Sequence, residues 1–169
     1  MATAISISTA NRLSYSLAGS PDLGTLGEGY ETSVSRAVAN GTGSGQANAA
    51  WVELVTVPAG QVASLDLTNM VAEKFGFVGY VEFSVVKDVM VVNKESAAGR
   101  YVLWGVASPS DTTGYAARIN RGGDYRWTDY ADGVAVTSGN KVLYVANPGA
   151  APVLLEVAIC GIGTYHDNQ

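Results

Sequence analysis

The sequence predicts an all-β protein, an antiparallel β-sandwich or jelly roll of about ten short strands with one short helix and an extended N-terminal arm. Apolar residues, many of them valine, recur mainly at every second position, which is the period of a strand with one buried face. Clusters of glycine, proline, asparagine and aspartate separate these segments. Of the 169 residues, 47% are hydrophobic and 15% are charged, so the chain can build the core of one domain.

The first part of the chain is predicted to be an arm, residues 1–29, and the remainder, residues 30–169, a β-sandwich domain. Apolar residues alternate with small polar ones at 5–7 and again at 13–17, which indicates two short extended pieces. A turn signal at 20–24 and several glycines follow them. Arms of this kind often become ordered only against a neighbouring molecule.

The domain begins with strand signals at 30–39, followed by a glycine-rich connection. Alternating segments at 51–57 and 61–67 flank the turn sequence Pro58-Ala59-Gly60. Two alternating segments joined by a short turn predict a β-hairpin.

The predicted helix follows directly. Thr68 or Asn69 could serve as its N-cap, and Gly76 marks its end. The helix is two turns long at most.

The strongest apolar run is 80–93, and its alternation shifts near Val85 and Val86, which predicts a β-bulge or bend. Further strands are predicted at 100–107, 125–128, 133–137, 141–147 and 153–162.

Composition excludes several classes of function. The formal net charge of −5 leaves no basic surface for nucleic acid. Cys160 is the single cysteine, so no disulfide framework or cysteine-based metal site is expected, and its place in an apolar strand predicts a buried, inert thiol. The first eight residues lack the charged and apolar regions of a secretory signal, and turn residues interrupt the longest uncharged runs, so no membrane-spanning segment is expected.

Catalytic chemistry is not expected either. His166 is the only histidine and lies three residues from the C-terminus, where we expect the chain to fray. Acidic residues cluster at 124–132 and recur within predicted strands, where they are typical of the solvent-exposed face. We therefore expect a protein that is not an enzyme and that has no cofactor and no metal.

Aromatic residues and arginines concentrate between residues 115 and 130. They could cap the core, form a protein interface, or stack on sugar rings, because aromatic residues serve all three purposes. The low charged fraction favours association with other subunits. The candidate interface residues are Tyr115, Arg118, Arg121, Tyr125, Trp127 and Tyr130.

From residue 40 onward the order of short motifs resembles the head decoration, or cement, proteins of tailed bacteriophages, a family of small virion structural proteins. The motifs are Asn40-Gly41, Gln46-Ala47-Asn48 with Trp51, Pro58-Ala59-Gly60, Leu65-Asp66-Leu67, Phe75-Gly76, Phe83-Ser84-Val85-Val86-Lys87, Trp104-Gly105-Val106-Ala107, Arg121-Gly122-Gly123, Gly133-Val134-Ala135-Val136, Leu143-Tyr144-Val145-Ala146-Asn147 and Ile159-Cys160-Gly161-Ile162-Gly163-Thr164.

This resemblance implies a homotrimeric β-sandwich subunit that is made in the host cytoplasm and sits on the capsid exterior. Its partner would be the major capsid protein, whose neighbouring copies it would bridge, and the arm would be a clasp between subunits. Two other functions stay open: a tail or head-tail component, and a carbohydrate-binding β-sandwich that uses the aromatic residues named above.

Overall fold

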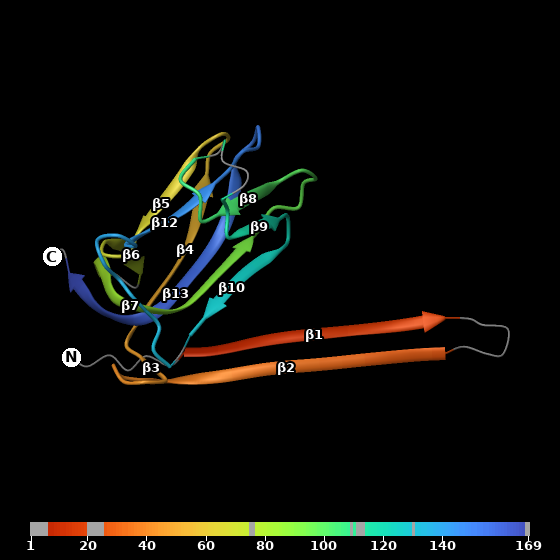
Figure 1. Ribbon diagram of the computed structural model, residues 1–169, viewed down its shortest axis with the longest axis horizontal. Helices are drawn as coiled ribbons and strands as arrows, with labels where there is room; N and C mark the ends of the chain where they lie inside the picture. Colours follow the sequence, from red (N-terminus) through yellow and green to blue (C-terminus); the bar gives the residue numbers. More distant parts are fainter. Residues whose placement is uncertain are drawn as a thin grey trace.

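The computed structural model describes residues 7–19, 26–74, 77–108, 110, 114–129 and 131–167. These residues form β-strands and connections and contain no helix. Two sheets face each other and make up the body, and a long two-stranded ribbon projects from it (Figure 1). The prediction of an all-β protein with mostly antiparallel sheets is confirmed.

The larger sheet has the order β10-β7-β13-β4, and β6 and β11 also pair with β7. All of its pairings are antiparallel. Its strands are β4 (Ala49–Val57), β6 (Met70–Lys74), β7 (Phe77–Asn93), β10 (Asp124–Thr128), β11 (Val134–Ala135) and β13 (Val153–Asp167).

The smaller sheet has the order β5-β12-β8-β9, again antiparallel. Its strands are β5 (Val62–Asp66), β8 (Tyr101–Trp104), β9 (Ala117–Asn120) and β12 (Val142–Ala146). The ribbon consists of β1 (Ile7–Gly19) and β2 (Leu26–Asn40), and the short β3 (Gln46–Ala47) pairs in parallel with the end of β2.

The core lies between the two sheets. In β13, Val153, Leu155, Val157 and Ile159 are buried because alternate residues of a strand face the same side. They join one cluster of buried residues with side chains of the smaller sheet such as Val145. Two sheets that share one apolar core are consistent with a β-sandwich.

Strand β7 contains two bulges, where the shift in alternation near Val85 and Val86 predicts one bulge or bend. Its pairing with β13 skips one residue at Ser84 and another at Lys87. The buried apolar residues change parity accordingly, from Phe83 to Val86 and on to Val89, because each extra residue moves the following side chains to the other face.

Two glycines of β13 make these bulges possible. A Cβ atom on Gly161 would lie 2.0 Å from the Val85 carbonyl oxygen, and one on Gly163 would lie 2.5 Å from the Glu82 carbonyl oxygen. Only glycine therefore allows the two backbones to approach this closely.

The predicted hairpin at 51–67 is wrong, although both of its strands exist. Strand β4 pairs with β13 in the larger sheet, whereas β5 pairs with β12 in the smaller one. The turn at 58–60 therefore carries the chain from one sheet to the other. The side-chain nitrogen of buried Asn147 holds this turn by donating to the carbonyl oxygens of Val57 and Pro58, at 3.0 and 3.2 Å.

The predicted short helix is also wrong. Thr68 belongs to a turn in which its backbone N–H and hydroxyl donate to one oxygen of Asp66, at 3.0 and 2.7 Å. The next residues form β6, which pairs with β7 from Met70 opposite Val81 onward. A helix of two turns is marginal in water, so sheet pairing prevails over a weak capping signal.

Three further features differ from or add to the sequence-based picture. The strand expected at 30–39 lies within β2, so the expected boundary between residues 29 and 30 falls inside that strand. Strand β9 was not predicted. His166 does not lie in a frayed end, since β13 continues to Asp167.

We predict that Gly161→Ala lowers the free energy of unfolding by about 3 kcal/mol, the upper end of the usual cost of overpacking, because the added methyl group meets backbone atoms. Chemical denaturation monitored by circular dichroism measures the change. Gly139→Ala is the matched control, because a Cβ atom there meets only the Thr137 hydroxyl at 3.9 Å. Equal stability of the two variants would contradict the role given to Gly161.

Candidate functional site

The candidate interface residues do not form a single patch. Tyr125 and Trp127 lie on β10 and pack against the core. Arg118 lies on β9, Arg121 in the turn that follows it, and Tyr115 before it. Tyr130 lies outside the described residues. The five described positions are thus divided between a pocket and the surface around β9.

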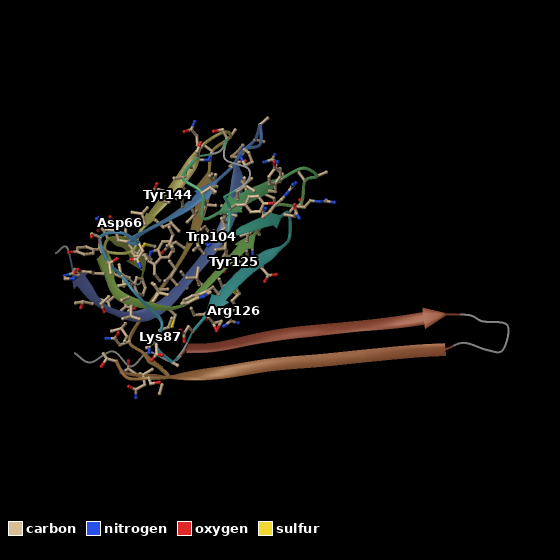
Figure 2. All side chains as sticks on the ribbon, viewed as in Figure 1. Asp66, Lys87, Trp104, Tyr125, Arg126 and Tyr144 are labelled. Carbon is tan, nitrogen blue, oxygen red and sulfur yellow. The ribbon has the colours of Figure 1, made fainter. Side chains whose placement is uncertain are left out.

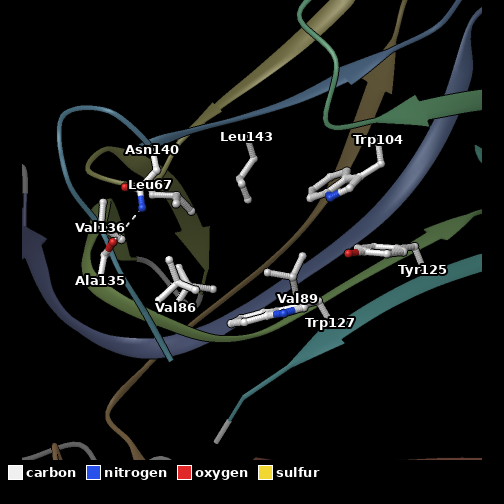
Figure 3. A pocket seen from close by; sticks show the side chains of 11 residues that line it. Leu67, Val86, Val89, Trp104, Tyr125, Trp127, Ala135, Val136, Asn140 and Leu143 are labelled. Carbon is white, nitrogen blue, oxygen red and sulfur yellow. Dashed lines mark hydrogen bonds between the residues drawn. The ribbon is translucent and has the colours of Figure 1, made fainter. Parts of the chain in front are cut away.

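Tyr125 and Trp127 line an apolar pocket of about 230 Å³ between the two sheets (Figure 3). Trp104 from the smaller sheet faces them, and its ring lies 6.0 Å from that of Tyr125. The pocket exceeds the apolar cavity of about 150 Å³ that holds benzene in an engineered protein. It can therefore accept an apolar group as large as an aromatic ring. The other lining residues are Leu67, Val86, Val89, Val134, Ala135, Val136, Asn140 and Leu143.

The amide of Asn140 in the pocket wall is already used within the chain. Its oxygen accepts hydrogen bonds from the backbone N–H and hydroxyl of Thr137, at 2.6 and 3.0 Å, and its nitrogen donates to the Ala135 carbonyl at 2.9 Å. A sugar needs several polar partners for its hydroxyl groups. The pocket therefore suits an apolar ligand better than a carbohydrate.

The two surface arginines contact their own chain. The Arg118 guanidinium lies 3.8 Å above the ring of Tyr101, a cation–π arrangement. Arg121 donates to the Ser96 carbonyl at 2.7 Å. Tyr115, by contrast, is 37% exposed.

The bulge at Lys87 anchors the ribbon. Lys87 is 2% exposed, and its ammonium group donates to the carbonyls of Gly43, at 2.9 Å, and Ala131, at 3.4 Å. Gly43 belongs to the loop between β2 and β3, so Lys87 lies beside the base of the ribbon (Figure 2).

Asn48 provides a second anchor at the glycine bulges. Its N–H donates to the Gly161 carbonyl at 3.0 Å, and its side-chain oxygen accepts the N–H of Gly163 at 2.9 Å. The segment that leads out of the ribbon is thereby bonded to both glycines that permit the bulges. The bulges therefore lie where the ribbon is attached to the body. Sequence reasoning predicts a bulge here but does not identify the attachment.

Next to Lys87, Asp88 forms an ion pair with Arg126 of β10. Two hydrogen bonds join the guanidinium to the two carboxylate oxygens, at 3.1 and 2.9 Å, and both side chains are mostly buried, at 12% and 8% exposure. A bidentate pair of this kind fixes both groups in one geometry. It ties the edge strand β10 to β7 beside the bulge.

The single histidine contacts other side chains of the fold, and the single cysteine is buried. His166 lies 2.9 Å from Glu82 and stacks on Tyr80, with ring centroids 4.5 Å apart. Cys160 is buried, as predicted. Burial, together with the nearby charge of Asp88, raises the pKa of the Cys160 thiol to about 11, so little of the reactive thiolate forms at neutral pH.

Asp66 is also engaged locally. The hydrogen bonds from Thr68 and the charge of Lys141, 3.4 Å away, hold the pKa of the Asp66 carboxyl below its ordinary value. In the described part of the chain, no group of three or more histidine, cysteine, aspartate or glutamate residues is placed to hold a metal ion.

Exposed apolar side chains lie along β4 and β6. Leu54 is 62% exposed and Val71 is 57% exposed, and together they line an open groove whose floor includes Trp51. The indole N–H of Trp51 donates to the Val71 carbonyl at 2.7 Å and so joins the two strands.

Comparison with known proteins does not assign the chain to a family: no protein-family model and no curated protein matches its sequence. Among the residues that the structure describes, no helix is long and apolar enough to span a membrane.

We predict that Asp88→Asn lowers the free energy of unfolding by about 3–5 kcal/mol, because it removes the charge of one partner from a mostly buried, bidentate ion pair. Glu156→Gln is the control. Its partner Lys94 lies 3.0 Å away in an exposed pair, so the loss should stay below about 1 kcal/mol. Urea titration of both variants makes the comparison, and similar losses would show that Asp88–Arg126 does not stabilise the edge of the sheet.

Proposed function

We propose that this chain is a structural subunit of a virion, a decoration or cement protein that joins neighbouring major capsid proteins on the outside of a tailed-bacteriophage head and catalyses no reaction. The resemblance in motif order supports this role. The observation that carries it is the ribbon, in which 13 residues of β1 and 15 of β2 lie outside the two sheets of the body. Ordering them costs about 1–2 kcal/mol per residue for the backbone alone, and a two-stranded ribbon by itself is at best marginally stable in water, so we expect contact with another molecule to stabilise it.

The strand order supports the jelly-roll form of the β-sandwich. The chain crosses repeatedly between the sheets, so that β4, β13, β7 and β10 lie in one sheet and β5, β12, β8 and β9 in the other. Eight strands in two such sheets are typical of jelly rolls, which occur in viral capsid proteins and in lectins. The fold class thus agrees with a capsid role without being specific to it.

The surface supports association with a protein shell. Leu54 and Val71 present apolar area on one face of the body, and only 15% of all residues are charged. Contact with capsid subunits, and within the homotrimer that the resemblance implies, would remove such area from water. Many modest contacts on one shell add up through multivalency.

The polar side chains support a role without catalysis. Asp88 bonds Arg126, Glu156 pairs with Lys94, and Glu82 contacts His166. Each of these acidic groups thus pairs with a basic residue. A catalytic pair of carboxylates would instead need two acidic groups positioned together at one site.

The carbohydrate-binding alternative has one observation in its favour, the aromatic rings of Trp104, Tyr125 and Trp127 around the pocket. The same rings pack on the core, and the only side-chain amide in the pocket wall already bonds Thr137 and Ala135 of its own chain. The capsid role is therefore the better supported of the two.

The proposed role predicts the copy number of the chain in the virus that encodes it. Densitometry of purified particles should show about as many copies as a decoration lattice requires, comparable with the major capsid protein. Mild dissociation should release the chain before the shell opens and lower the temperature at which the particles lose their DNA. A few copies per particle would identify a tail component instead, and absence from the particle would refute a virion role.

A further inference from the structure

The pocket between the two sheets has a buried floor and an exposed rim. Its buried lining residues are Leu67, Val86, Val89 and Trp104. The exposed lining residues all belong to the segment 134–140. The pocket therefore opens along this segment and extends inward between the sheets (Figure 3).

The rim is held in place by hydrogen bonds of the chain itself. Val134 pairs with Val86 of β7, and the N–H of Val136 donates to the Ser84 carbonyl at 2.8 Å. The amide of Asn140 closes the turn that follows through its bonds to residues 135 and 137. The pocket is thus formed without a ligand, as most small-molecule sites are.

Two polar groups at one end of the pocket are free to bind a ligand. Trp104 is 6% exposed, and in the described part of the chain neither its indole N–H nor the Tyr125 hydroxyl makes a hydrogen bond. No fully buried side-chain nitrogen or oxygen there lacks a partner, so both atoms are open to a space that water can enter. Figure 3 shows them facing the pocket, and their rings lie 6.0 Å apart.

The remaining walls select an uncharged, flat ligand. Among the described residues, none that lines the pocket carries a charge, so a charged ligand would lose its hydration without gaining a counter-charge. The rings of Trp104, Tyr125 and Trp127 offer flat apolar surfaces to a ligand ring.

The volume sets the size of the ligand. The pocket has about 230 Å³, roughly one and a half times the cavity of about 150 Å³ that holds benzene. Two fused rings have about one and a half times the atoms of benzene. A ligand of this size would expel water from the Trp104 N–H and the Tyr125 hydroxyl. Since a buried donor without an acceptor is costly, the ligand must supply an acceptor at that end.

We propose that the pocket binds a small, uncharged compound of two fused aromatic rings that carries a hydrogen-bond acceptor. The acceptor receives the indole N–H of Trp104 and the hydroxyl of Tyr125, and the rings lie in the apolar part of the pocket. This site is independent of the proposed capsid role, because the ligand lies within the body of one chain and needs no second subunit.

Nuclear magnetic resonance of the full chain tests the site with quinoline and naphthalene. The two molecules have the same shape, but only quinoline has an acceptor nitrogen. Quinoline should bind with a dissociation constant below about 1 mM and about tenfold more tightly than naphthalene. It should move the indole N–H signal of Trp104 and leave that of Trp51, which already donates to the Val71 carbonyl at 2.7 Å. Absence of a Trp104 shift, or an equal shift of Trp51, would refute the site, and naphthalene binding as tightly as quinoline would refute the acceptor.

Removal of one hydroxyl tests the polar end of the pocket. Tyr125→Phe keeps the ring and should weaken quinoline binding about fivefold, while naphthalene binding stays unchanged. Tyr144→Phe is the matched control, because Tyr144 follows the pocket residue Leu143 on β12 and so faces the other side of the sheet. Unchanged quinoline binding in Tyr125→Phe, or an equal loss in Tyr144→Phe, would overturn the proposal. Particle densitometry decides the capsid role separately.

Discussion

The structure depends on the close approach of β7 and β13 at the two bulges. Gly161 and Gly163 leave room for the carbonyl groups of β7, and the extra residue Lys87 is thereby buried with its ammonium group on the Gly43 carbonyl. Asn48 bonds both glycines. A local irregularity in one strand thus joins the base of the ribbon to buried residues of the body.

The body and the ribbon differ in how they are stabilised. In the body, alternate residues of β13 and of the facing strands fill one core, so it is stable by its own packing. In the ribbon, β1 and β2 pair with each other, and neither strand enters either sheet of the body. The body therefore has a core of its own, whereas under the proposed role the ribbon would gain stability from contact with another molecule.

The sequence predicts what is encoded locally and misses what depends on partners distant in the chain. Alternation located most strands, and its shift near Val85 located the bulges. The turn at 58–60 is visible, but its sequence does not tell whether the flanking strands pair with each other or enter two sheets. Five residues at Met70–Lys74 are too few to distinguish helix from strand by period. The sequence does not predict the pocket: Tyr125 and Trp127 lie close together in the chain, whereas Trp104 belongs to a strand of the other sheet.

Hydrogen exchange of the ribbon amides in the intact chain tests the central proposal most directly, that contact between subunits stabilises the ribbon. The account predicts that amides of 9–17 and 28–36 become more protected as protein concentration rises, while those of β13 are protected at every concentration. Ribbon amides that exchange as fast as those of an unstructured peptide throughout, or that are equally protected in a dilute monomer, would contradict it.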